Sequence, residues 1–210
     1  MNERAKQIAK GLLQIKAVKI NINRHFVWAS GWNSPIYCDN RKTLSYPKIR
    51  KLIYTAFAEK INEKYSDCEI IAGVATGAIA HGVLVAEMLK KPFVYVRSSP
   101  KSHGMENLIE GELTENSKVV VIEDLVSTGG SSIAAIDAIR EKGGRVLGML
   151  AIFSYEFNAA RENFTKANCE LTTLCDYTTF LSEAIKCGYI NAADTEIINN
   201  WRKSPETWKK

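Results

Sequence analysis

The stretch that most constrains the fold is residues 118–132, with the sequence KVVVIEDLVSTGGSS. Its unbroken apolar run at 119–122 predicts a strand buried on both faces, as in a parallel sheet covered by helices. Glu123 and Asp124 follow this run directly, and we expect them where the strand leaves the sheet at its carboxyl end. Open α/β sheets bind ligands along that edge, so the same residues predict both a fold and a site.

The turn after the two acids is small and rich in hydroxyl groups. Gly129 and Gly130 let the backbone come close to a ligand, and the free N–H groups of a helix beginning at Ser132 would bind an anion. Carboxylates accept hydrogen bonds from hydroxyl groups and repel phosphate. Acids beside an anion cradle therefore predict a sugar-phosphate site. For the Gly/Ser turn alone, an ordinary strand-to-helix loop is the alternative.

Segments typical of strands and helices alternate along the chain from residue 69. We expect strands at 69–74, 93–97, 118–123, 145–153 and 171–174, helices at 79–90 and 132–142, a short helix from 156, and two helices after the last strand. This alternation predicts an α/β fold with an open parallel sheet flanked by helices. A helix at 4–14, short β-rich pieces and a helix from Pro47 precede it.

Length and composition favour a single domain of residues 1–210, with an N-terminal helix and flap at 1–46 and an α/β core at 47–210. Hydrophobic residues make up 46% and charged residues 24%, and no apolar run is long enough to span a bilayer. We therefore expect a cytoplasmic protein without a membrane partner. The net charge of +5 fits a small polyanionic substrate as well as nucleic acid.

Residues 98–116 break the alternation, because polar, glycine-bearing chain stands where a helix is expected. So long a loop in a compact domain is usually a lid over a site. It carries Lys101 and His103 and begins beside Arg97 at a strand end, so groups that bind anions or carry protons would share one mobile segment. A solvated charged loop is the alternative.

Four stretches together resemble the orotate phosphoribosyltransferases, which are type I phosphoribosyltransferases. They are SGWNSPIYCDNRKTLSYP at 30–47, GVATGAIAHG at 73–82, VRSSPKSHGMENLIEG at 96–111, and VVVIEDLVSTGGSS at 119–132. The resemblance implies the type I phosphoribosyltransferase fold and a reaction of orotate with 5-phosphoribosyl 1-diphosphate that gives orotidine 5′-monophosphate and diphosphate. It also implies Mg²⁺ held mainly by the substrate, without a protein metal site, and a homodimer in which each lid reaches the neighbouring active site.

The resemblance also assigns roles to residues. Lys101, His103 and Asp124 would be catalytic. The residues that would bind the phosphoribosyl donor are Arg97, Lys101, His103, Glu123, Asp124, Leu125, Val126, Ser127, Thr128, Gly129, Gly130 and Ser131. The lid would neutralise charge on the departing diphosphate while the acids stabilise positive charge on the ribose. Ser127 would also contact orotate, and Arg41 is a further candidate because orotate carries a carboxylate.

The chain departs from some members of this family on the orotate side. Ala29 and Gly77 stand where some members carry lysines, and Phe153-Ser154-Tyr155-Glu156 stands where some carry an arginine. Two other functions are alternatives: a regulator that senses the phosphoribosyl donor and binds nucleic acid, and a transferase for another base. The first needs a DNA-reading domain with a basic helix, and members of the second class lack this lid and flap pattern.

One histidine and two tryptophans are expected to be structural. His81 lies on a predicted helix and is interpreted as a packed or surface histidine, not a ligand. Trp201 and Trp208 are expected to pack the last helix back onto the domain.

Overall fold

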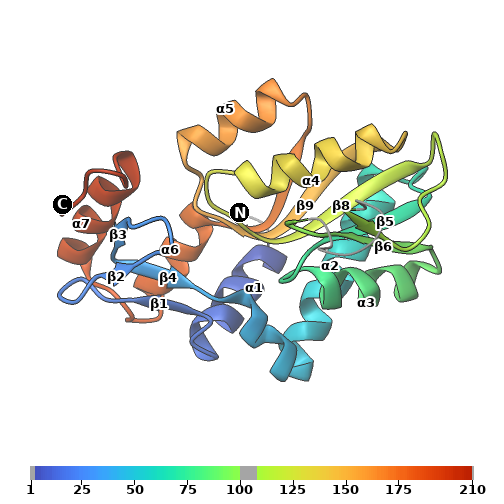
Figure 1. The fold of residues 1–210 in the computed structure, drawn as a ribbon. Coiled ribbons are helices and arrows are strands. Elements are labelled where there is room, and N and C mark those ends of the chain that lie inside the picture. Colours follow the sequence, from blue (N-terminus) through green and yellow to red (C-terminus); the bar gives the residue numbers. More distant parts are fainter. Residues whose placement is uncertain (1–2, 100–107, 210) are drawn as a thin grey trace.

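A six-stranded sheet forms the centre of the molecule, with helices on both of its faces (Figure 1). The computed structural model describes residues 3–99 and 108–209. The strand order is β10-β9-β8-β5-β6-β7, and neighbouring strands are parallel except for β6 and β7. The strands are β5 (Ile70–Val74), β6 (Phe93–Val96), β7 (Ile109–Glu110), β8 (Lys118–Val126), β9 (Arg145–Ser154) and β10 (Leu171–Asp176). The predicted open parallel sheet flanked by helices is confirmed.

Strand β8 is buried on both faces, as its apolar run predicts. Val119 and Val121 pack into the core under helices α4 (Gly130–Glu141) and α5 (Asn158–Lys166). Val120 and Ile122 pack into the opposite core, which also contains residues of helices α1, α2, α3 and α6. These four helices are α1 (Glu3–Gln14), α2 (Pro47–Lys64), α3 (Ile79–Leu89) and α6 (Tyr177–Lys186). Among the described helices, none is long and apolar enough to cross a membrane.

Two small antiparallel sheets form a hood at one end of the molecule, defined here as residues 18–45 (Figure 1). Strand β1 (Val18–Ile20) pairs with β4 (Ile36–Cys38), and β2 (Phe26–Val27) pairs with β3 (Asn33–Ser34). The 3₁₀ helix η1 (Asn40–Ser45) follows and leads into α2. Short strands separate from the main sheet are what the sequence predicts for this segment.

The last helix, α7 (Ala192–Lys203), ties the hood to the core. Trp201 is fully buried and its indole N–H donates to the Asn33 carbonyl at 3.1 Å. Its ring centroid lies 5.8 Å from Trp28 of the hood and 5.5 Å from Phe157 of the core. The expectation that Trp201 packs the last helix onto the domain is confirmed.

Several predicted boundaries are wrong, among them the start of the helix expected from Ser132, which begins at Gly130. Strand β8 continues to Val126 because it pairs with β9 up to Val126↔Ser154, so Glu123 and Asp124 lie inside the strand. The helix expected from 156 begins at Asn158. The expected loop at 98–116 contains β7, which pairs with β6; residues 100–107 of that loop lie outside the described part of the chain.

Replacing Trp201 by alanine should lower the free energy of unfolding by about 3–5 kcal/mol, because a fully buried indole leaves a cavity between hood and core. Trp208→Ala is the control, since that ring is only half-buried and meets His25 edge-on. It should cost about 1 kcal/mol or less. Urea unfolding measures both, and equal losses would contradict the role given to Trp201.

Candidate active site

A pocket of about 280 Å³ opens where the carboxyl ends of β5 and β8 meet the hood. The hood contributes Cys38, Asp39 and Arg41, the end of β5 and the turn after it contribute Val74, Ala75, Thr76 and Gly77, and β8 and α4 contribute Glu123, Asp124, Leu125 and Ser131. A smaller pocket of about 120 Å³ shares Val74, Ala75 and Ser131 and is also lined by Arg97. The two acids and the helix start therefore line one cavity system, as predicted.

The larger cavity of about 670 Å³ between α5 and the β9–β10 edge holds none of the predicted site residues. Of those residues, Glu123, Asp124, Leu125 and Ser131 line the 280 Å³ pocket, and Arg97 and Ser131 line the 120 Å³ pocket. Ser127, Thr128, Gly129 and Gly130 line neither, and Val126 is buried in the core. Lys101 and His103 lie outside the described residues. The size of a cavity alone therefore does not identify the candidate active site.

The two carboxyl groups differ in their surroundings. Glu123 is only 4% exposed, and its carboxylate accepts hydrogen bonds from the Ser132 hydroxyl and the Asp124 backbone N–H, each at 3.0 Å. Burial raises the pKa of Glu123 well above its ordinary value, and the charge of Asp124 raises it further. Burial also raises the pKa of Asp124, although Arg41 opposes that shift. Asp124 is the more accessible of the two acids.

The turn between β8 and α4 is held in place by α5. Gly129 has a φ of +84°, and a Cβ there would meet the Phe164 ring at 3.0 Å, so this position requires glycine. The Asn163 amide donates to the Thr128 carbonyl at 2.9 Å. Gly130 is different, since nothing lies within 4 Å of a Cβ built on it. Gly129 thus serves the turn, and Gly130 leaves the start of α4 open to an anion.

The turn after β5 packs directly against Asp124. The peptide bond between Ala75 and Thr76 is cis. A Cβ on Gly77 would lie 2.3 Å from the Asp124 carboxylate, so only glycine fits there without moving that acid. This gives a physical reason for one departure from the family pattern, the missing lysine at this position.

Residues of the hood complete the site, and sequence reasoning missed most of them. The Arg41 Nε donates to Asp39 Oδ1 at 2.7 Å, and the Arg41 side chain is 60% exposed. The Asn40 amide donates to the Asp124 backbone carbonyl at 2.6 Å. The sequence places these residues directly after the SPIYC segment. That position predicts that they follow a strand of the hood, but it does not predict which element of the core they contact.

His81 is packed, as predicted. It is fully buried on α3, with Nε2 2.9 Å from the Thr43 hydroxyl, and burial lowers its pKa to about 4. A neutral histidine in this position joins α3 to the hood. It does not reach the pocket as one of its lining residues.

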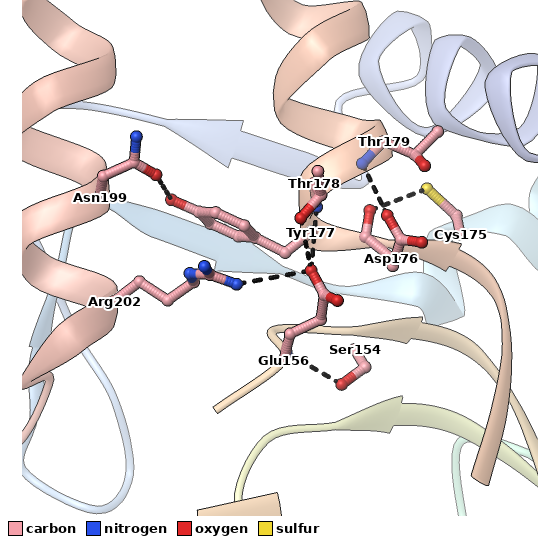
Figure 2. A network of polar contacts seen from close by, with 9 residues as sticks. All are labelled: Ser154, Glu156, Cys175, Asp176, Tyr177, Thr178, Thr179, Asn199 and Arg202. Carbon is pink, nitrogen blue, oxygen red and sulfur yellow. Dashed lines mark hydrogen bonds and ion pairs between the residues drawn. The ribbon is translucent and has the colours of Figure 1, made fainter. Parts of the chain in front are cut away.

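Glu156 ends the stretch Phe153-Ser154-Tyr155-Glu156, and it faces the C-terminal helices (Figure 2). Its carboxylate accepts from the backbone N–H and hydroxyl of Thr178 at 3.1 and 2.8 Å, and it pairs with Arg202 at 3.5 Å. Arg202 in turn lies over the Tyr177 ring, 4.6 Å from its centroid. Glu156 therefore anchors α6 and α7, and it does not line the acidic pocket.

Comparisons with known proteins place the chain in a family. Residues 40–174 match the family of the phosphoribosyl transferase domain. The chain is 59% identical over 208 residues to an orotate phosphoribosyltransferase of Porphyromonas gingivalis, covering 99% of both chains. It is 55% identical to that of Phocaeicola vulgatus, covering 97% of this chain and 96% of the relative. The crystal structure of orotate phosphoribosyltransferase from Aeropyrum pernix superposes with a TM-score of 0.75 at 27% identity, covering 88% of this chain and 99% of that one.

Replacing Glu123 by glutamine should make the protein more stable than the wild type at pH 8 and change little near pH 4. The folded state holds a proton on this carboxyl group more tightly than the unfolded chain does. Its stabilising contribution is therefore full below the ordinary pKa of glutamate and is lost as pH rises through the raised pKa. Urea unfolding across this pH range measures the difference.

Glu63→Gln serves as the control for this comparison. Its carboxyl group is exposed and Lys60 lowers its pKa, so any effect of that substitution has the opposite sign. A stability difference between Glu123→Gln and wild type that does not grow with pH would refute the raised pKa.

Proposed function

The chain belongs to the phosphoribosyltransferases and, within them, to the orotate phosphoribosyltransferases, and we propose from this that it transfers the phosphoribosyl group of 5-phospho-α-D-ribose 1-diphosphate to orotate. The products are orotidine 5′-monophosphate and diphosphate, in a step of pyrimidine synthesis. The observation that carries the proposal is the meeting of Glu123, Asp124 and the start of α4 on one pocket. This pocket offers hydrogen-bond acceptors for a diol beside donors for a phosphate.

The ribose would lie against Asp124, with its 5′-phosphate at the turn of residues 127–131. Free backbone N–H groups at the start of α4 and the hydroxyl groups of this turn suit a phosphate. Departure of diphosphate leaves positive charge on the sugar ring, and a nearby carboxylate stabilises that charge most in the transition state. Glu123 is buried and accepts a hydrogen bond from the Ser132 hydroxyl, so it would hold β8 against α4, while Asp124 would face the sugar.

The diphosphate would occupy the side of the cavity formed by the turn after β5 and by Arg97. Lys101 and His103 of the lid would neutralise the charge that builds up on it. Mg²⁺ would bind mainly to diphosphate and hydroxyl oxygens of the substrate and would neutralise charge on the leaving group. In the described ranges, no three His, Cys, Asp or Glu side chains cluster as a metal site.

Orotate would lie beneath the hood, in contact with Ser127 and with Arg41. Arg41 supports this placement because it lines the pocket and its largely exposed guanidinium could turn from Asp39 to a substrate carboxylate. Five free cysteines are in keeping with the reducing cytoplasm, where we place the activity.

A homodimer with shared active sites is the assembly we propose. Helix α3 supports it, because this helix is apolar on nearly all sides and its Val83 and Met88 side chains are 45% and 48% exposed. Such a helix is normally buried, and a second copy of the chain would cover that face.

Incubation with phosphoribosyl diphosphate, Mg²⁺ and a single base should consume orotate and leave uracil, hypoxanthine and adenine unchanged. Each base is followed separately by its ultraviolet absorbance or by chromatography. Turnover of another base in place of orotate would assign the chain to a different transferase. Binding of the donor without turnover of any base would favour a regulatory protein.

Lys101→Ala and Asp124→Asn should each lower kcat by about 10²–10³-fold, since each removes charge stabilisation of the transition state. If Lys101 acts in the neighbouring subunit, mixing the two inactive variants before refolding restores one intact site in each hybrid dimer. A 1:1 mixture should then recover about one quarter of the wild-type activity. A mixture as inactive as its two components would show that each site belongs to one subunit.

A further inference from the structure

The end of β8 extends beyond its neighbour β5. The ladder between the two strands ends at Gly73↔Ile122, whereas pairing with β9 continues to Val126↔Ser154. Asp124 therefore lies in a part of β8 that is paired only with β9. Its backbone carbonyl accepts a hydrogen bond from a side chain instead, the Asn40 amide at 2.6 Å. A buried carbonyl without a partner would be costly, so this contact helps to define the strand end.

Asn40 is itself held rigidly. It is 1% exposed, and its Oδ1 atom accepts from the Cys38 thiol at 3.3 Å. Its backbone carbonyl accepts from the Thr43 hydroxyl at 2.5 Å. The amide group is thereby fixed in the orientation that points its N–H toward Asp124. A locked rotamer of this kind is what precise placement of a neighbouring group requires.

Thr43 is fixed in turn by His81 of α3. The Thr43 hydroxyl gives its proton to Asn40, so it accepts from His81 Nε2 at 2.9 Å, and the histidine carries its proton on Nε2. His81 Nδ1 has no hydrogen-bond partner among the described residues, in keeping with a neutral ring. A buried chain of contacts thus runs from α3 through the hood to the acid at the end of β8.

We propose that Asn40 is a positioning residue that sets the placement of Asp124 through the Asp124 backbone carbonyl, with Thr43 and His81 holding Asn40 in place. This inference rests on the proposed function, in which Asp124 stabilises charge on the ribose. Misplacement of a reacting group by about 1 Å can cost about 10²-fold in rate. Asn40 lies next to Arg41 on the hood, so the contact also couples the orotate side of the pocket to the sugar side.

Asn40→Ala should lower kcat by about 10- to 100-fold and change the KM for the phosphoribosyl donor by less than about threefold, because the phosphate contacts stay intact. Asn33→Ala is the matched control. Its amide also donates to a backbone carbonyl at 2.6 Å, that of Lys209, but far from the acids. The control should keep kcat within about twofold of wild type, with melting temperatures measured for both variants.

Three further substitutions keep the test decisive if Asn40→Ala folds poorly. Thr43→Val removes the hydroxyl between His81 and Asn40 and should lower kcat, whereas Thr43→Ser keeps that hydroxyl and should restore most of it. Asn40→Asp places a further carboxylate near Asp124, in addition to Glu123, and should move the acidic limb of the kcat/KM profile to higher pH.

The proposal is overturned if the folded Asn40→Ala protein keeps the kcat of Asn33→Ala, or if Thr43→Val and Thr43→Ser lose activity equally. It is also overturned if kcat falls only in step with the folded fraction. If the wild type converts orotate in the same assay, any of these results refutes only the role of Asn40 and leaves the proposed function standing. A wild type that does not convert orotate refutes the proposed function instead.

Discussion

The constraint on which this structure depends is a buried carboxyl group, Glu123, next to a half-buried one, Asp124, near the end of a central strand. Taking a carboxylate out of water is costly unless hydrogen bonds or a cation offset the loss. Glu123 is offset by Ser132 of the following helix and by the backbone N–H of Asp124. The strand, the turn and the helix must therefore keep one relative geometry, and that geometry brings an acid beside a helix start that suits an anion.

Support for this strand end comes from opposite sides of the sheet. On one face, α5 fixes the turn through the Asn163 bond to Thr128 and through the Phe164 ring against Gly129. On the other, Asn40 of the hood bonds the Asp124 carbonyl. The hood is in turn held by α7 through Trp201, and α7 is tied to the core through the Arg202–Glu156 pair (Figure 2). The C-terminal helices thus stabilise the site without lining the acidic pocket.

Local sequence patterns were enough to predict much of the fold and the centre of the site. The valine-isoleucine run of β8 and the glycine turn into α4 are contiguous in sequence. A buried strand and a turn into a helix can therefore be predicted from these fifteen residues alone. Contacts between residues that are far apart in sequence cannot be predicted in this way. Asn40 and Asp124 lie 84 positions apart. Nothing in the sequence near either residue indicates that pairing with β5 ends before Asp124, so that the Asp124 carbonyl can accept from Asn40. Glu156 likewise acquires its role only once α6 and α7 are in place.

The close approach of Gly77 to Asp124 limits which side chains can line this part of the pocket. A side chain at position 77 would displace the acid, so a lysine cannot stand there while Asp124 keeps its place. On the proposed function, cationic contacts to the diphosphate would then fall to Arg97, which lines the neighbouring 120 Å³ pocket, and to the lid. Glu110 pairs with Arg97 at 3.2 Å and orients it. The acid beside the sugar and the arginine beside the leaving group would then line different pockets, which suits a reaction that separates positive from negative charge.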